Sequence, residues 1–514
     1  MRRAGAVVVF ALLTGGCSAI LGIPDPSMRA PDGDGGDADA GTGMENAVTI
    51  TVSDVYHLED GSTMSMPGFP GELAAYRRTA DGFSDPVVAF PVQGSDGRYA
   101  IYGLPPGEEY YLKTYYWSPG IVALDGGYYI VSQARSLDLS REWWGRPGWQ
   151  SGPTGTRLVF DLFGMTSWQA GDTLALLVPN VVGYYIDVVG GLEVGATQVN
   201  ELTFNWADRP LVWSSLGDRL HVQHLTPRFI EGTGDVQVVV DEFVDASLEQ
   251  VGGVSTPVSG TFSPVPNSGS TVVDWPASDF SAALGLSART TYSYGYGTIE
   301  IDPVQLVDLP VLSLVLQPQT ELARATVEFA NPFPDDFGLT RVVDVSHGLR
   351  YDFPGAPPEV YTDFNTRVVV TESLAEVQDG PRPLVHAPVD VRIDGLSLAQ
   401  EPPDVSAVLS LDEPTVVTWQ VDPDSPNQPT SYRLAITELT WTNTKTYPAS
   451  TVLAAQTSST EFTVPPGILQ PDRSYYLVMT SVYAPNGDES APWRYSLPSS
   501  EAQIVTGLFS VLDP

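Results

Sequence analysis

Short stretches of alternating apolar and polar residues recur along the chain from residue 46 onward. In the first of them, Val48, Ile50 and Val52 are separated by threonines, which is the period of a strand with one buried face. The 48 glycines and 44 prolines lie between such stretches, and turn residues at short intervals favour many short strands over helices. The pattern predicts an all-β protein made of tandem β-sandwich domains.

The middle of the chain contains two segments, 158–176 and 202–222, that repeat one pattern. Each predicts a strand, a loop with a tryptophan, a Gly-Asp turn and a second strand, and the copies are offset by about 46 residues. A length of 514 residues predicts roughly three to five domains. We expect region 119–400 to form one or two β-rich domains with this partial duplication, and their internal boundary stays open.

The segment 402–512 carries two motifs in the order expected for a known fold. A predicted strand with Trp419 is followed by Leu469-Gln470-Pro471, with Tyr475 four residues after the proline. This arrangement resembles a fibronectin type III domain. The resemblance implies that Trp419 fills the gap between two sheets and that the Tyr475 hydroxyl binds a backbone group at a corner.

Residues 97–107 read Gly-Arg-Tyr-Ala-Ile-Tyr-Gly-Leu-Pro-Pro-Gly, and Tyr110 and Tyr111 follow shortly afterwards. This run resembles the carboxypeptidase regulatory-like (transthyretin-like) β-sandwich domains. The resemblance covers residues 46–118. It implies a hairpin in which one strand ends at Leu-Pro-Pro-Gly and the chain returns as a tyrosine-rich strand.

The N-terminus combines two basic residues, an apolar stretch at 6–13, three small residues and then Cys17, the only cysteine. This order predicts a signal peptide at 1–16, because the apolar stretch is too short for a membrane-spanning helix. The junction resembles a bacterial lipobox whose leucine is displaced by one place, to Leu13. The resemblance implies lipidation of Cys17 and attachment to a membrane through that lipid. Ser18 resembles the outer-membrane-sorted class, so we expect an outer-membrane or cell-surface location.

Residues 17–45 are rich in glycine and aspartate and predict a flexible, disordered tether. An EF-hand loop starting at Asp32 would need glycine at its sixth position and glutamate at its twelfth, but Asp37 and Gly43 stand there. We therefore predict neither calcium binding nor any other cofactor.

The formal net charge is −37 at pH 7. Because phosphate contacts dominate affinity for nucleic acids, such an acidic chain is not expected to bind DNA or RNA. It is also repelled by anionic lipid, which leaves the lipid on Cys17 as the expected membrane attachment.

The closest pair of histidines is His221 and His224. Residues three apart on a strand face opposite sides, so both rings cannot bind one metal ion, and no metal site is predicted. From the duplication we expect His221 to face solvent and His224 to face the apolar side.

The candidate recognition element is the segment 143–149. It contains Trp143, Trp144, Arg146 and Trp149 in a Gly/Pro-rich stretch, which predicts a loop. Tryptophan and arginine are enriched at binding hot spots, so we expect Trp143 or Trp144 to be exposed and to contact a glycan or a partner protein.

No catalytic motif is found in the sequence, and no catalytic residue is predicted. The favoured hypothesis is a non-catalytic cell-envelope lipoprotein that serves as a binding or structural module. Two alternatives stay open: a polysaccharide-binding adhesin that acts through residues 143–149, and an envelope hydrolase whose site lies within 119–400.

Overall fold

The computed structural model confirms the all-β prediction, with 56% of the described residues in strands and 3% in helix. Helix α1 spans Ala277–Ala283. The structure describes residues 47–58, 62–68, 70–79, 82–114, 127–181, 187–189, 191–229, 236–265, 267–285, 294–303, 311–316, 322–333, 338–352, 361–377, 379–398, 407–410, 414–439, 449–494 and 496–512. The predicted signal peptide, Cys17 and the predicted tether lie outside these ranges.

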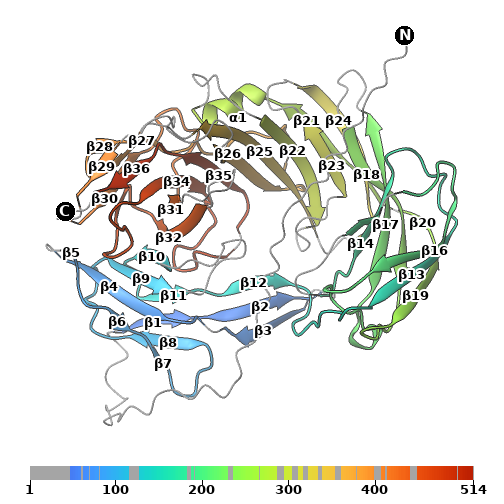
Figure 1. The fold of residues 1–514 in the computed structure, drawn as a ribbon, viewed down its shortest axis with the longest axis horizontal. Helices are drawn as coiled ribbons and strands as arrows, with labels where there is room; N and C mark the ends of the chain where they lie inside the picture. Colours follow the sequence, from blue (N-terminus) through green and yellow to red (C-terminus); the bar gives the residue numbers. More distant parts are fainter. Residues whose placement is uncertain are drawn as a thin grey trace. The chain divides into compact units, whose positions relative to one another are not determined.

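One long sheet runs through the described chain, and most of its strands carry labels in Figure 1. In spatial order its strands are β6 (Val87–Val88), β4 (Leu73–Thr79), β9 (Tyr110–Thr114), β10 (Tyr128–Ser132), β32 (Ala449–Thr457), β31 (Ser431–Leu439), β34 (Ser474–Tyr483), β35 (Ser499–Val505), β26 (Tyr361–Ser373), β25 (Leu339–Asp352), β22 (Tyr294–Pro303), β23 (Leu312–Leu316), β18 (Val236–Ala246), β17 (Leu220–Phe229), β14 (Thr173–Leu177) and β15 (Asp187–Val189). Four short strands add to it: β5 (Gly82–Phe83), β20 (Ser263–Pro264), β36 (Phe509–Val511) and β29 (Ala407–Leu409).

Four smaller sheets bury apolar side chains against the long sheet. Their strands are β11 (Ser136–Asp138), β1 (Val48–Thr51), β8 (Arg98–Ile101) and β7 (Phe90–Pro91); β16 (Gln198–Asn205), β13 (Arg157–Phe163) and β19 (Ser255–Thr261); β21 (Asn267–Trp275) and β24 (Leu322–Asn331); and β28 (Leu396–Ser397), β27 (Val389–Ile393), β30 (Val416–Gln420) and β33 (Glu461–Thr463). Buried apolar clusters fill the spaces between the layers. Alternation along strands such as β1 and β13 therefore accompanies sandwich packing, as predicted.

The prediction of a hairpin at Leu-Pro-Pro-Gly is wrong. Strand β8 pairs with β1 and β7, whereas β9 pairs with β4 and β10, so the chain crosses from one layer of the sandwich to the other. Leu104 is buried and fills the core at this crossing. Gly103 and Gly107 adopt φ angles of 83° and 78°, which glycine adopts at little cost, and so allow the chain to turn.

Both copies of the duplicated segment have the predicted order of elements. The equivalent strands are antiparallel neighbours, because β13 pairs with β16 and β14 pairs with β17. The Gly-Asp turns are also equivalent: Gly171 and Gly217 have φ angles of 98° and 84°, and Asp172 and Asp218 are both buried. Each copy therefore places one buried carboxyl group at its turn.

Two packing details expected from the fibronectin type III resemblance are present. Trp419 on β30 is 3% exposed and meets Tyr432 of β31 edge to face, with ring centroids 5.2 Å apart. The ring thus lies between the two sheets. The Gln470 N–H donates a hydrogen bond of 2.9 Å to the Tyr475 hydroxyl, so this hydroxyl binds a backbone group at the corner.

Hydrogen-bonded strands cross the predicted limits of segment 402–512. Strand β27 precedes this segment and pairs with β30, while β26 pairs with β35 and β10 pairs in parallel with β32. Residues 45–514 form one compact unit. The division of this unit into separate domains stays a prediction.

Candidate functional site

A further sheet contains β12 (Arg141–Trp144), β2 (Ser53–His57) and β3 (Thr63–Pro67), in the order β12-β2-β3. The parallel pair β1–β11 continues along the chain as the parallel pair β2–β12. Residues 141–144 are therefore a strand and not the predicted loop. Aromatic residues favour strands, and β2 provides a hydrogen-bonding partner for residues 141–144. The glycines and prolines therefore end the strand only at Gly145.

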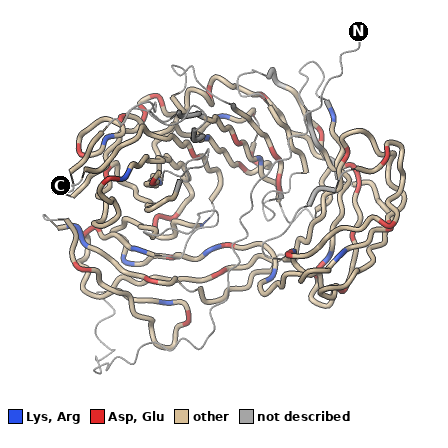
Figure 2. Tube along the Cα trace, viewed as in Figure 1, with Lys and Arg blue, Asp and Glu red and all other residues tan. Residues whose placement is uncertain are grey.

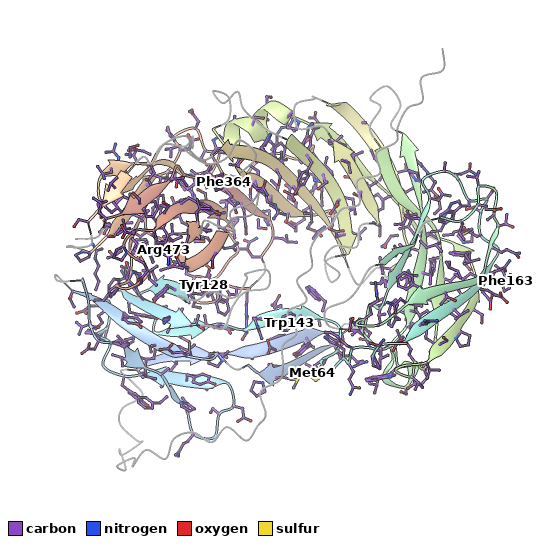
Figure 3. All side chains as sticks on the ribbon, in the orientation of Figure 1. Met64, Tyr128, Trp143, Phe163, Phe364 and Arg473 are labelled. Atoms are coloured by element: carbon purple, nitrogen blue, oxygen red, sulfur yellow. The ribbon has the colours of Figure 1, made fainter. Side chains whose placement is uncertain are left out.

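None of the residues of these three strands is buried: those of β2 and β12 are half-buried, and all those of β3 are exposed. We call this sheet the open sheet. It nevertheless carries two tryptophans, a tyrosine and two methionines, and Met64 and Met66 are 38% and 42% exposed. Figure 3 labels Met64 and Trp143 on it. A sheet rich in large apolar side chains that does not face a core is typical of a contact surface.

The register of the open sheet gathers two rows of side chains on one face. Cross-strand neighbours point to the same side of a sheet. The rows are Trp143–Tyr56–Met64 and Arg141–Asp54–Met66. This face therefore combines aromatic rings, flexible thioethers and one pair of opposite charges.

The indole of Trp143 is held in place by its neighbours. Its Nε1 donates a hydrogen bond of 2.7 Å to Asp54 Oδ1, and Arg141 Nε donates one of 2.9 Å to the same oxygen. The Arg141 guanidinium carbon lies 4.9 Å from the centre of the Trp143 ring. Because the ring is already ordered, the Trp143 side chain would lose less conformational entropy when a ligand stacks on it.

Tyr56 lies beside Trp143 on the same face. Burial, and secondly the negative charge of Asp54, raise the pKa of the Tyr56 phenol. The phenol therefore stays protonated at neutral pH and keeps a hydroxyl group that can donate a hydrogen bond to a partner.

Trp144 lies on the opposite face of the open sheet. Its ring packs on His57 with centroids 4.2 Å apart, and His57 Nε2 lies 3.8 Å from a Glu142 carboxylate oxygen. Like Trp143, Trp144 is half-buried, whereas Trp419 is buried. Both indoles thus keep part of their surface open to solvent.

The structure places Arg146 away from this surface. Arg146 is 9% exposed, and its Nε and terminal nitrogen donate to the two carboxylate oxygens of Asp218 at 2.7 and 2.5 Å. The close approach depends on Gly145, since a Cβ atom there would lie 2.6 Å from the Val181 nitrogen. Arg146 is therefore committed to the buried carboxylate of the second duplicated turn.

Trp149 also serves packing, because it lies against the buried cluster under sheet β16-β13-β19. Of the four residues predicted to bind a ligand, Trp143 and Trp144 share the open sheet, and Arg146 and Trp149 do not. Sequence reasoning missed Tyr56, Met64 and Met66. These apolar residues alternate with polar ones in two short segments, which was the available signal in the sequence. Only the pairing of β2 with β3 places them on the face that carries Trp143.

His221 does not face solvent as predicted. Its ring stacks between Phe243 and Phe333, with centroids 5.0 and 5.4 Å away, and its Nδ1 lies 2.6 Å from Asp245 Oδ1. The prediction for His221 is wrong because the second face of β17 is covered as well. Phe333, which follows β24, provides part of that cover.

His224 faces the apolar side as predicted, and it lies in a buried polar cluster. Its Nδ1 is 2.9 Å from Glu242 Oε1 and its Nε2 is 3.0 Å from Asp172 Oδ2, while the ring stacks on Trp168 at 5.3 Å. Burial alone lowers the pKa of His224, but the hydrogen bonds with Glu242 and Asp172 outweigh it, so the pKa is raised. The first duplicated turn thus pairs its carboxyl group with a histidine.

No protein-family model and no curated protein matches this chain. Within the described ranges, no helix is long and apolar enough to cross a membrane.

Proposed function

We propose that this protein is a non-catalytic binding module of the bacterial cell envelope that contacts a partner protein through the open sheet. The observation that carries the proposal is the contrast between this sheet and the four that cover cores. Large aromatic and methionine side chains lie on strands with no buried residue. Aromatic anchors at the centre of a patch supply most of the binding energy in known interfaces.

The proposal includes attachment of the chain to the outer membrane through a lipid on Cys17. It is supported by the signal-like segment that ends at this cysteine. Radiolabelled palmitate is expected to label the wild-type protein and not the Cys17→Ser variant in cells that natively produce it. Equal labelling of both proteins would contradict lipid attachment at Cys17.

Replacing Trp143 by alanine is expected to weaken partner binding by at least tenfold, because the variant removes an ordered indole from the face that carries the two rows. A photoreactive side chain at position 66 of the full chain, on the same face as Trp143, should form one discrete conjugate in cells that natively produce the protein. Trp143→Ala should remove this conjugate.

Phe163→Ala is the matched control, since Phe163 is 47% exposed on strand β13, outside the open sheet. It should leave the conjugate unchanged. If Trp143→Ala and Phe163→Ala behave alike, the open sheet is not the contact surface.

A glycan is the second candidate ligand, favoured by the partly open and oriented ring of Trp143. Aromatic rings held in this way can stack on the apolar face of a sugar. A glycan array probed with the full chain tests this alternative. Specific binding that both Trp143→Ala and Trp144→Ala abolish would favour the adhesin.

A further inference from the structure

We propose that β3 is the docking edge of the open sheet, on which an extended, positively charged segment of the partner polypeptide adds as a fourth strand. This inference rests on the proposed function, because it specifies how the same sheet would recognise its partner. It commits to a chemical class of partner: a polypeptide that carries lysine or arginine and alternating apolar residues.

Strand β3 lies at the edge of the open sheet. Among the described strands it pairs with β2, and no other described strand lies on its second side. All five of its residues are exposed. An edge strand of this kind presents a row of backbone groups to which another strand can bind.

The hydrogen bonds around β3 show which of its backbone groups point outward. The Leu58 N–H donates to the Ser62 carbonyl at 2.8 Å, and the Gly68 N–H donates to the Val52 carbonyl at 3.0 Å. Bonding alternates along an antiparallel pair, so Met64 and Met66 bond to β2. Thr63 and Ser65 consequently direct their N–H and C=O groups to the free side.

Pro67 is the third outward-facing position, and it has no N–H group. A proline is tolerated there because that N–H would not take part in the β2–β3 ladder. The free edge thus offers two donors, from Thr63 and Ser65, together with the carbonyl groups of all three residues. This set is sufficient for a short added strand.

Apart from Pro67, the side chains of β3 do not protect this edge. The strand reads Thr-Met-Ser-Met-Pro and has no charged residue, although 17% of the chain is charged. Free edges in native proteins are commonly blocked by charges, lysine above all. Met64 and Met66 instead extend the apolar rows of the open sheet to its edge, where flexible thioethers can adapt to apolar side chains of an incoming strand.

Charge decides between the possible occupants. Within the open sheet, Asp54 and Glu142 outweigh Arg141 by one negative charge when His57 is neutral, and the whole chain has a net charge of −37. Acidic residues recur along the described trace in Figure 2. A second copy of this chain would be repelled, whereas a basic segment would be attracted.

The test uses the full chain and an eight-residue peptide of alternating lysine and valine. Fluorescence anisotropy of the labelled peptide should show binding that weakens as salt is added. Hydrogen exchange should show new protection at the amides of Thr63 and Ser65. Ser65→Pro, which removes an outward N–H, should weaken the binding of the peptide by at least tenfold, while Ser65→Val should not.

Two peptides test the inference on the wild-type protein, independently of any variant. The same peptide with N-methylated valines should not bind, since it cannot complete the ladder, and its glutamate–valine analogue should not bind either. Equal binding of either peptide overturns the inference. Sedimentation that shows a dimer lost in Ser65→Pro would also overturn it, in favour of pairing between two copies.

The outcome can be separated from that of the proposed function. If Trp143→Ala removes the conjugate formed in cells and Ser65→Pro does not, the open sheet binds its partner without strand addition. If neither substitution changes the conjugate, the proposed function itself fails.

Discussion

Replacing His224 by alanine is expected to lower the free energy of unfolding by about 3–5 kcal/mol. His224 is 1% exposed and bridges Asp172 and Glu242, so its removal leaves two buried carboxyl groups facing a cavity. The midpoint of urea denaturation measures the effect. His57→Ala is the control, because His57 is half-buried and its contact with Glu142 is 3.8 Å long. The control should cost less than about 1 kcal/mol.

The same histidine should make stability depend on pH in a defined direction. The pKa of His224 is raised in the folded protein by Glu242 and Asp172, against the opposing effect of burial. The contribution of His224 to the free energy of unfolding is fully present below its ordinary pKa of about 6.5. It is lost as the pH rises through the pKa of His224 in the folded protein. The difference in stability between wild type and His224→Gln should therefore shrink between pH 6 and pH 9.

His347 provides an internal control with the opposite sign. Burial lowers the pKa of His347, so its neutral form is favoured in the folded protein. Its contribution is present above pH 6.5 and is lost as pH falls. If the differences for His224→Gln and His347→Gln change with pH in the same direction, the role assigned to the Glu242–His224–Asp172 cluster is wrong.

Trp419→Ala is expected to destabilise the protein by about 3–5 kcal/mol, the usual cost of removing a buried tryptophan. The ring is 3% exposed and packs edge to face on Tyr432, between the sheets of the C-terminal sandwich. Near-UV circular dichroism during urea denaturation follows the loss. The fragment 402–512 alone should be less stable than the same residues in the full chain, because β27, β26 and β10 would be missing.

Phe163→Ala is the control for this experiment as well. Its exposed ring leaves little apolar contact to lose, so the change should stay within about 0.5 kcal/mol. Similar midpoints for Trp419→Ala and Phe163→Ala would show that Trp419 does not support the core between these sheets.

Local patterns predicted the elements, but they did not predict which strands would be neighbours. Alternation placed the first strand at Val48, and the duplicated Gly-Asp pairs marked equivalent turns. Strand pairing is set by contacts between residues that are distant in sequence, and a local hydrophobic pattern carries no information about such contacts. The crossing at Leu104 shows the difference: Pro and Gly predicted a reversal, and the buried leucine led the chain into the opposite layer.

The candidate site was only partly predictable, because its residues are also brought together by contacts distant in sequence. The tryptophans at 143 and 144 could be identified from composition, because rings beside arginine suggest recognition. The fate of Arg146 depended on Asp218, 72 residues away. The methionines of β3 acquire meaning only when β2 places them in the rows that contain Trp143 and Arg141.

The parallel pairing of β10 with β32 has a consequence for biosynthesis. It joins residues 128–130 to residues 454–456, and the chain emerges from the ribosome N-terminus first. One edge of strand β10 therefore stays unpaired until most of the protein has been synthesised. During this time β10 can pair with strands of other chains. Prematurely terminated products that end before residue 449 would keep that edge permanently. They should aggregate or be degraded, so quality control of this protein depends on its last strands.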